Sequence, residues 1–332
     1  KNKIGRKNNI NSKIIGWLKL LYTKFVHIPD QYIGWYFSAV KKSNNIIDAG
    51  FIPDIIFSSA TPYTSHLVAK KVSNKYNIPW IAEFRDLWSD NHNRMSSLFD
   101  RWLEKNTMHN SKAMITVSEP LTKILINKYK QPIYTIQNGF DPEDFSFQVS
   151  GIISQKINIV YTGSIYENKM DPSPLFIALA ANKDLQNNVV LNFYGNSSNF
   201  ISDLSKKYNL ELMVKIHDLV PRSEILNIQK KADILLLLTW NSPKEKGILT
   251  GKFFEYIASG NAILSIGAFK DTPSEIVVED KFGIATNDPE EITKFISSYQ
   301  KGKYNNNLIN RNKYDRQIQI NKLAEIIDKH AN

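Results

Sequence analysis

Residues 232–260 read ADILLLLTWNSPKEKGILTGKFFEYIASG and contain an apolar strand followed by a helix. The run Ile234–Leu238 has no polar alternation, which is typical of a strand buried on both faces of a sheet. A helical pattern then runs over Gly251–Ala258. A strand, a loop and a helix in this order form the repeating unit of a parallel sheet covered by helices.

The same unit recurs along most of the chain. Short apolar runs predict further strands at Asp54–Ser58, Trp80–Phe84, Ala113–Val117, Ile133–Ile136, Ile157–Tyr161, Val189–Tyr194, Val214–Ile216, Ala262–Ile266 and Gly283–Ala285. Helical patterns lie between them, notably Ser65–Tyr76, Pro120–Tyr129, Pro174–Ala181, Arg222–Lys230 and Pro289–Tyr299. The sequence therefore predicts an α/β protein with two Rossmann-like, doubly wound domains that face each other across a cleft.

The periodic pattern is interrupted once in the middle of the chain. Polar and small residues replace it over Asp144–Gln155, where we expect the hinge between the domains. We predict a first domain at residues 1–148 and a second domain at residues 149–310. A final helical pattern, Arg311–His330, lies in the segment 311–332, and we expect this helix to cross back onto the first domain.

Composition limits the classes of protein that fit. The chain has 332 residues, of which 42% are apolar, so it is long enough for two domains with separate cores. It contains no cysteine, which excludes disulfides, thiolate metal sites and a cysteine nucleophile. Its apolar runs are shorter than a membrane span, and we see no signal-peptide pattern. We expect a cytoplasmic protein.

The net charge of +10 is concentrated near the N-terminus. Residues 1–29 contain seven Lys and Arg and no acid, which leaves 35 basic against 32 acidic residues in the rest of the chain. Apolar residues alternate with these bases at helical spacing, as in an amphipathic helix that lies on an anionic membrane surface. The other interpretation is a domain helix whose apolar face packs inward. We do not expect nucleic acid as a partner, because no recognition motif accompanies the charge.

Ligands of open parallel sheets bind at the carboxyl ends of the strands. The residues that follow the predicted strands are rich in glycine, hydroxyl groups and charges, so they are the candidates for a binding site. They are Ser59–Pro62, Arg85–Trp88, Ser118–Glu119, Asn138–Gly139, Gly163–Lys169, Gly195–Ser198, His217–Arg222, Trp240–Lys252 and Gly267.

The start of the helix at Gly251 has the features of an anion site. Unpaired N–H groups and the positive dipole end of a helix suit a pyrophosphate, and Thr250 and Gly251 allow a close approach. Lys252 adds a cation. Glu255 lies one turn further along the same face, where a carboxylate can accept hydrogen bonds from ribose hydroxyls. The other interpretation is an ordinary helix start with a surface Lys–Glu pair.

Four segments resemble motifs of family 4 glycosyltransferases and occur in the family's order. Residues 247–260 are similar to the donor-binding helix, in which a Lys-x-x-Glu-Tyr string precedes a small residue and a glycine. Phe84–Trp88 resembles an Arg-Asp-x-Trp turn, Gln137–Asp141 an Asn-Gly-x-Asp turn, and Tyr161–Tyr166 the first loop of the donor domain. The resemblance spans about residues 50–330 and implies a GT-B fold and a retaining glycosyltransferase that needs no metal or cofactor.

The resemblance also assigns roles to single residues. Glu255 matches the second Glu of the family's E-x7-E motif, which holds the donor ribose. Gly247 stands at the position of the first Glu, and Glu245 lies two residues before it. Ser164 occupies the position of a phosphate-binding Arg, whereas Lys169 retains the role of its Lys partner. The other interpretation of Lys169 is a solvated loop lysine.

The nucleobase is expected near residues 217–222. Val220 and Pro221 can offer backbone groups to a base edge. Guanine readers of the family often have an acid near the position of Arg222, and an arginine cannot accept a hydrogen bond. The sequence therefore favours a UDP-linked donor. His217 is either a histidine at a strand end or a ligand-binding residue.

On the other side of the expected cleft, Arg85 and Asp86 follow a predicted strand. Asp86 can orient an acceptor hydroxyl or accept its proton, with Arg85 beside it. The other interpretation is a structural ion pair that holds the turn. Ser59, Thr61 and Tyr63 are expected to line the acceptor channel.

Two further residues complete the set of candidates. Gly163 and Asn138 lie within the resembling motifs, and we expect both to contact the donor. His66 and His92 stand alone in the sequence, and we expect each to be structural or exposed.

These features together predict transfer of a sugar from a nucleotide sugar to a saccharide or lipid-linked acceptor, in surface polysaccharide synthesis. Alternatives are a nucleotide-sugar 2-epimerase of the same architecture and a non-catalytic nucleotide-sugar-binding protein. The family's first strand and glycine-rich loop have no counterpart in residues 1–29, so we expect a chain without its N-terminal first strands.

Overall fold

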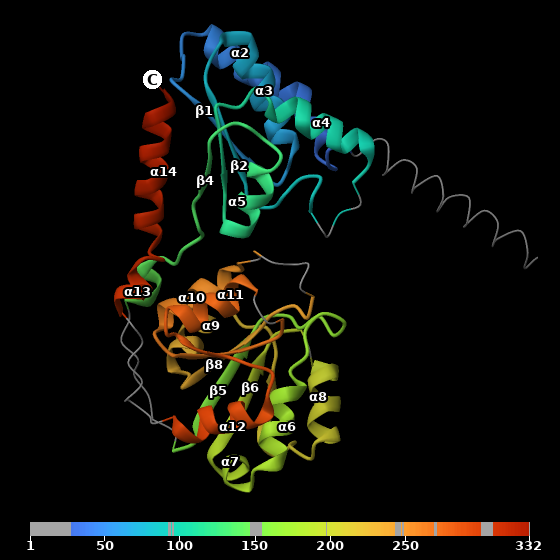
Figure 1. Cartoon of the computed structure of the whole chain (residues 1–332), viewed down its shortest axis with the longest axis vertical. Coiled ribbons are helices and arrows are strands. Elements are labelled where there is room, and N and C mark those ends of the chain that lie inside the picture. Colours follow the sequence, from blue (N-terminus) through green and yellow to red (C-terminus); the bar gives the residue numbers. More distant parts are fainter. Residues whose placement is uncertain are drawn as a thin grey trace, which may run out of the picture. The chain divides into compact units, whose positions relative to one another are not determined.

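The computed structural model describes residues 28–91, 94, 96–146, 155–196, 198–242, 247, 249–268, 271–299 and 308–331. They form two compact units, each built on a parallel sheet (Figure 1). The first unit comprises the described residues up to Thr135 together with those from Ala324 onward, and the second comprises Ile136–Leu323. The sequence placed the boundary at residue 148. The difference arises because Phe140 and Phe145 already pack in an apolar cluster of the second unit.

In the first unit, the described strands follow one another in chain order across the sheet. They are β1 (Ile56–Ala60), β2 (Trp80–Phe84), β3 (Ala113–Thr116) and β4 (Ile133–Thr135). The helices are η1 (Ile33–Trp35), α2 (Tyr36–Asp48), α3 (Thr64–Tyr76), α4 (Leu98–Met108) and α5 (Glu119–Ile126), with the end of α14 (Arg316–Ala331). Trp80 at the start of β2, Phe84 at its carboxyl end and Trp88 in the turn that follows are fully buried in the core of this unit.

The second unit contains a parallel sheet whose described strands have the order β10-β9-β8-β5-β6-β7. Their bounds are β5 (Ile157–Thr162), β6 (Val189–Tyr194), β7 (Val214–His217), β8 (Ile234–Leu238), β9 (Ala262–Ile266) and β10 (Gly283–Ala285). The bounds of β6, β8, β9 and β10 coincide with those predicted from the sequence. The chain order reverses between β5 and β8, as in doubly wound sheets.

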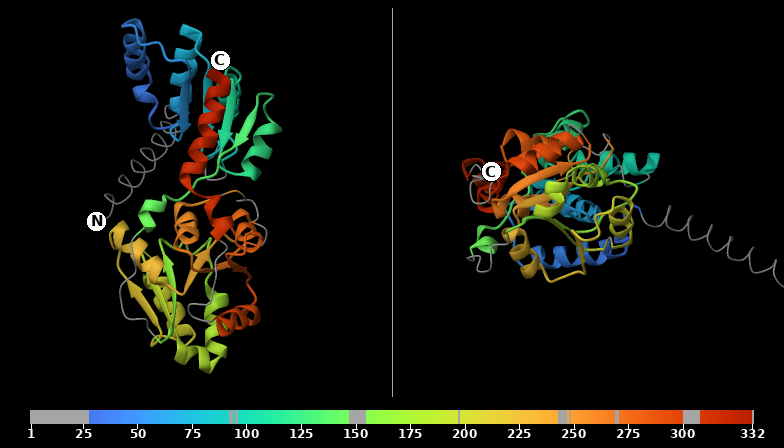
Figure 2. Two further views of the ribbon diagram at one scale, coloured as in Figure 1. Left: turned by 90° about the vertical axis from the view of Figure 1, so that its left-hand side faces the viewer. Right: turned by 90° about the horizontal axis from the view of Figure 1, so that it is seen from below.

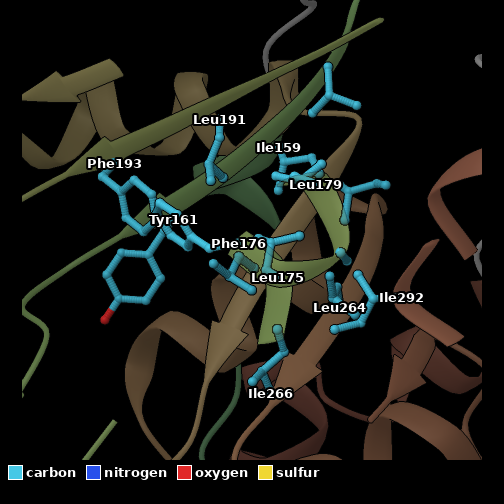
Figure 3. Packing of buried hydrophobic residues seen from close by; sticks show 14 of the residues in the cluster. Ile159, Tyr161, Leu175, Phe176, Leu179, Leu191, Phe193, Leu264, Ile266 and Ile292 are labelled. Atoms are coloured by element: carbon cyan, nitrogen blue, oxygen red, sulfur yellow. The ribbon is translucent and has the colours of Figure 1, made fainter. Parts of the chain in front are cut away.

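Helices cover both faces of the second sheet (Figures 1 and 2). One apolar cluster, which includes Phe176, Leu191 and Leu264, joins the sheet to α6 (Ser173–Ala181), α7 (Lys183–Asn188), α8 (Ser198–Lys207) and α12 (Pro289–Ser298) (Figure 3). A second cluster, which includes Leu226 and Phe253, joins the other face to α9 (Arg222–Lys231), α10 (Gly251–Ser259) and α11 (Thr272–Glu279). The predicted doubly wound α/β architecture is confirmed for this unit.

The C-terminal helical pattern forms two helices, α13 (Leu308–Asn312) and α14, where the sequence predicted one. The turn between them contains Tyr314, whose hydroxyl donates a 2.6 Å hydrogen bond to Asp280. Its carbonyl accepts from Phe140 N at 3.0 Å, and Arg316 N donates to Phe140 O at 2.9 Å. This pairing with a distant segment interrupts the helix, and nothing local in the sequence signals it.

Among the helices that the structure describes, none combines the length and apolar character needed to cross a bilayer.

Candidate functional site

The loops after β5 and β8 meet where the strand order of the second sheet reverses. β5 pairs with β6 on one side and with β8 on the other. Loops that diverge from such a pair leave a crevice, which is the usual ligand site of an open α/β sheet. The two loops are tied together, because Asn241 N donates a 2.7 Å hydrogen bond to the Lys169 carbonyl. The crevice therefore has walls that are fixed relative to each other.

Helix α10 begins at Gly251, as the sequence predicts. Its N-cap residue is Thr250, which has an extended backbone with φ −82° and ψ 157°. Among the described residues, the N-cap side chain of Thr250 makes no capping hydrogen bond to the first turn of the helix. Thr250 and Gly251 are both exposed, and a Cβ on Gly251 would meet no atom within 4 Å. The first N–H groups of α10 and the positive end of its dipole are thus open to an anion.

The ammonium group of Lys252 is held by Tyr161. Lys252 Nζ donates a 3.0 Å hydrogen bond to Tyr161 Oη and lies 4.4 Å from the centre of the ring. Tyr161 Oη in turn donates to the Ser164 carbonyl at 2.8 Å. The Tyr161 ring belongs to an apolar cluster, and its hydroxyl points away from that cluster (Figure 3). Burial lowers the pKa of Lys252 to about 8, so its charge gains from a nearby anion.

Two glycines allow the loops at this site to approach each other. Gly163 has a φ of +117°, and a Cβ there would lie 3.7 Å from Lys252 Nζ. Gly195, which follows β6, has a φ of +137°, and a Cβ there would lie 2.3 Å from the Gly163 carbonyl oxygen. Backbones with φ in this range favour glycine, and the contact at Gly195 leaves no room for a side chain.

The second lysine of the predicted site rests on an aromatic ring. Lys169 Nζ lies 3.6 Å from the centre of the Trp240 ring, which is a close cation–π contact. Lys169 follows β5 and Trp240 follows β8, so this contact spans the crevice. The sequence did not assign roles to Tyr161 or Trp240. Their contacts join separate loops, and such contacts produce no regular spacing of residues in the sequence.

The Glu255 carboxylate is oriented by helix α9. Gln229 Nε2 donates to Glu255 Oε2 at 3.1 Å and to Thr162 Oγ1 at 3.0 Å. Arg222 lies 3.4 Å from Glu255 Oε1 and pairs more closely with Asp144, at 2.8 Å. The Glu255 side chain is 20% exposed and can still accept from a ligand. Gln229 is fully buried. No pattern in the sequence indicates its role, because it lies on a different helix from Glu255 and about one element away along the chain.

Lys252 and Glu255 therefore have different partners. The alternative interpretation of a surface Lys–Glu pair does not describe this helix start, because Tyr161 holds the lysine and Gln229 holds the carboxylate.

Two stacked rings lie beside the predicted base pocket. Val220 is half-buried and Pro221 exposed, and they lead directly into α9. The His217 ring stacks on Tyr194 with centroids 4.2 Å apart and planes 7° apart. His217 Nε2 lies 2.8 Å from Asn192 Oδ1. Because these residues end β6 and β7, they share the carboxyl edge with the lysine site.

The remaining residues predicted to contact the donor differ in burial. Asn138 and Ser164 are half-buried in the second unit. Gly247 is buried and has a φ of +92°. Glu245 lies outside the described residues, as does His92, which we expected to be structural or exposed.

The turn after β2 presents Arg85 and Asp86 at the surface of the first unit. Trp88 in the same turn is fully buried and stacks on Tyr63, with centroids 5.2 Å apart. Tyr63 Oη donates to the Leu87 carbonyl at 2.7 Å. Tyr63 is only 3% exposed, so it supports the turn from inside, and its predicted contact with an acceptor finds no support in this position.

The loop after β1 contains the other acceptor-side candidates. Thr61 is exposed and Ser59 is half-buried, with its carbonyl accepting a 2.6 Å hydrogen bond from Ser65 Oγ. His66 is fully buried, its Nδ1 lies 2.8 Å from Ser58 Oγ, and burial lowers its pKa to about 3. His66 is a structural histidine, as predicted.

Part of the chain matches a known family, and its fold is similar to solved structures. Residues 20–144 match the family model for Glycosyltransferase Family 4. The structure of HepE from Anabaena in complex with UDP is similar over 89% of this chain and 82% of its own, with 17% identity and a TM-score of 0.69. This chain has the GT-B fold, and its residues 20–144 are similar to Glycosyltransferase Family 4.

Two further structures are similar to this GT-B protein. A glycosyltransferase from Rickettsia africae has a TM-score of 0.66 and 15% identity, over 89% of this chain and 81% of its own. A protein described as a UDP-N-acetylglucosamine 2-epimerase from Listeria monocytogenes has a TM-score of 0.57 and 13% identity, over 90% and 80%. At these identities the likeness shows the fold. No curated protein sequence matches the chain significantly.

Within the described parts of the GT-B protein, no group of three or more His, Asp and Glu side chains is arranged to hold a metal ion. That the site works without a metal or cofactor remains a prediction.

The lowered pKa of Lys252 predicts a specific pH dependence of stability. The folded pKa of about 8 lies below the ordinary value of 10.5, so the unfolded chain binds more protons between these two values. Stability should therefore rise with pH across this window. We expect the free energy of unfolding of the wild type to rise by about 1–3 kcal/mol more than that of Lys252→Met. Urea denaturation at a series of pH values measures this difference.

The matched control is Lys294→Met, which changes an exposed lysine of α12. Its pH profile should parallel that of the wild type. Parallel profiles for Lys252→Met and the wild type would contradict the assignment of a desolvated ammonium group.

Proposed function

We propose that this protein is a retaining glycosyltransferase that takes a sugar from a UDP-linked donor. The acceptor is a saccharide or lipid-linked saccharide, in the synthesis of a surface polysaccharide. The observation that carries the proposal is the convergence of two ammonium groups, an open helix N-terminus and an oriented carboxylate at the switch point of the second sheet.

The positive groups fit a leaving diphosphate. Sugar transfer breaks the bond between the anomeric carbon and the diphosphate, so negative charge grows on the diphosphate in the transition state. Lys252, Lys169 and the first N–H groups of α10 are fixed before the reaction by Tyr161, Trp240 and the helix itself. Preorganised positive groups of this kind stabilise developing charge without reorganisation. They supply the role of the family's arginine, at whose position Ser164 stands.

The carboxylate fits a ribose. Gln229 and Arg222 fix the two oxygens of Glu255. Each oxygen keeps a further lone pair, and an ionised carboxylate can accept from two neighbouring hydroxyls. Glu255 therefore holds the ribose while its neighbours on α10 bind the diphosphate, and both contacts come from one rigid helix.

The residues of the expected base pocket favour a uridine nucleotide as the donor. Val220 and Pro221 offer backbone groups to the base, and Asn138 and Gly163 complete the donor contacts. Arg222 provides only N–H donors, which do not match the N–H groups of guanine. HepE is known in complex with UDP and with UDP-glucose, which supports the same class of donor here.

The acceptor side of the proposal rests on the first unit. Arg85 and Asp86 are exposed on a turn that Trp88 anchors in the core. Asp86 orients or deprotonates the acceptor hydroxyl with Arg85 beside it, and Ser59 and Thr61 contact the acceptor chain.

A 2-epimerase is the second candidate, and the likeness to the Listeria structure supports it. The two reactions differ in their products. A transferase releases UDP when an acceptor is present, whereas an epimerase isomerises the sugar without an acceptor. Incubation with UDP-sugars and analysis of nucleotide and sugar products separate these activities, and binding without turnover would indicate a non-catalytic protein.

Glu255→Ala should weaken UDP binding by about 1.5–3 kcal/mol, because hydrogen bonds to a charged carboxylate are lost. Isothermal titration calorimetry measures the change, with thermal unfolding to verify the fold. Glu279→Ala, which removes an exposed carboxylate from α11, is the matched control and should bind UDP as the wild type does. Equal UDP affinity in Glu255→Ala would sink the assignment of the ribose site.

Lys169→Ala and Lys252→Ala should each lower kcat more than they raise KM, because the charge they stabilise grows in the transition state. Loss of one preorganised donor costs about 2.7–4 kcal/mol in activation free energy. Steady-state kinetics with an identified donor test this expectation, and Lys294→Ala serves as the control. If both variants kept the wild-type kcat, the diphosphate would have to bind elsewhere.

Peripheral contact with anionic lipid through residues 1–29 is also part of the proposal, and residues 1–27 lie outside the described part of the chain. Changing the seven bases to Gln should reduce binding to anionic vesicles, by about 1 kcal/mol for each base near the surface at low salt. Vesicle sedimentation at low and high salt measures it. Equal binding of both proteins would indicate that this segment has no electrostatic role at membranes.

A further inference from the structure

Three side chains at the carboxyl edge of the second sheet lie in one row. Tyr194 on β6 is in register with Thr162 on β5 and with His217 on β7. Thr162 Oγ1 accepts from Gln229 of α9 and lies 3.2 Å from the Tyr256 hydroxyl of α10. Residues in register on neighbouring strands share a face, so the row lies on the face that α9 and α10 cover. His217 thus lies on the sheet face that α10, with Glu255, covers. It is two strands away from Thr162.

The His217 ring has a defined tautomer. Asn192 Nδ2 donates a 2.8 Å hydrogen bond to Asn158 Oδ1, which turns Asn192 Oδ1 toward His217. His217 Nε2 lies 2.8 Å from that oxygen and must carry the proton that bridges them. Burial and the charge of Lys215 lower the pKa of His217, which favours the neutral ring at pH 7. Its Nδ1 is therefore an unprotonated acceptor.

The position of this acceptor is also fixed. Asn158 is held by Asp233, whose carboxylate accepts from Asn158 N at 2.7 Å and whose N–H donates to Asn158 O at 2.9 Å. Tyr194 stacks on the His217 ring and sets its plane. Tyr194 and His217 are both half-buried, so the pair is partly open to a ligand. A planar acceptor that cannot tilt or change tautomer can discriminate between the edges of flat ligands.

We propose that His217 Nδ1 accepts the ring N–H of the nucleobase and thereby selects uracil over cytosine. This inference rests on the proposed nucleotide-sugar function and deepens it by assigning the residue that reads the base. Uracil has an N–H at ring position 3, whereas cytosine has a lone pair there, which would face the lone pair of Nδ1. Tyr194 and Asn192 are positioning residues, because they act on the base through the plane and tautomer of His217.

The test compares nucleotides that differ only at this edge. Calorimetry should show that the wild type binds UDP at least about tenfold more tightly than CDP or 3-methyl-UDP, the size of one hydrogen bond and its mismatch. His217→Phe keeps the ring and removes the acceptor, so we expect UDP affinity to fall about tenfold. The three nucleotides should then bind within a factor of about two. His109→Phe, at an exposed histidine of the first unit, is the matched control.

Asn192→Leu provides a second variant, because loss of its amide frees the tautomer of His217. Its preference for UDP over CDP should decrease while the fold is retained, a change that a merely structural asparagine would not produce. The measurement of 3-methyl-UDP on the wild type needs no variant, so a folding defect in either mutant leaves the inference testable.

The outcomes separate the two levels of the proposal. If UDP does not bind the wild type, the proposed function fails. If UDP binds and Glu255→Ala weakens it, but His217→Phe keeps the preference for UDP over 3-methyl-UDP, only the role of His217 is overturned. Tighter binding of CDP than of UDP by the wild type would also overturn it, since that is the result expected for a protonated Nδ1.

Discussion

The geometry of the candidate site depends on Tyr161. Its ring is buried in the apolar cluster of the second unit, and its hydroxyl links the Lys252 ammonium to the Ser164 carbonyl. One side chain thus connects the core, the loop after β5 and the start of α10. Because the ring cannot move without disturbing the core, the cation is positioned before any anion arrives. This preorganisation suits a site where charge develops during the reaction.

The parallel register of the sheet extends the site beyond the phosphate region. Thr162, Tyr194 and His217 end three neighbouring strands and lie in one row. Gln229 connects the inner end of this row to Glu255. The order of groups along the edge, with cations at the switch point, a carboxylate beside them and a planar acceptor further out, follows the order of phosphate, ribose and base in a nucleotide. One register therefore positions the groups that we propose to contact all three parts.

Sequence patterns predicted the elements that local rules control. The bounds of β8 follow from an unbroken apolar run, and α10 begins where Thr250 and Gly251 end a polar loop. The roles of Tyr161 and Gln229 were not predicted, because their partners are about 90 and 26 residues away in the chain. Tyr63 was predicted to face an acceptor, but its hydroxyl bonds the turn that contains Trp88. Local chemistry indicates which residues are suitable, and packing decides where they point.

The sequence by itself determined the α/β class and the alternation of strands and helices along the chain. It also predicted the two lysines and the carboxylate of the candidate site. These properties depend on periodicity and residue type, which are local. Only the tertiary structure decided that Lys252 rests on Tyr161, that Gln229 orients Glu255, and that His217 Nε2 lies against Asn192 Oδ1. The break between α13 and α14 is of the same kind, since Tyr314 bonds Asp280 there. The physical reason is that hydrogen-bond direction, burial and tautomer are set by neighbours in space, and no spacing along the chain encodes them.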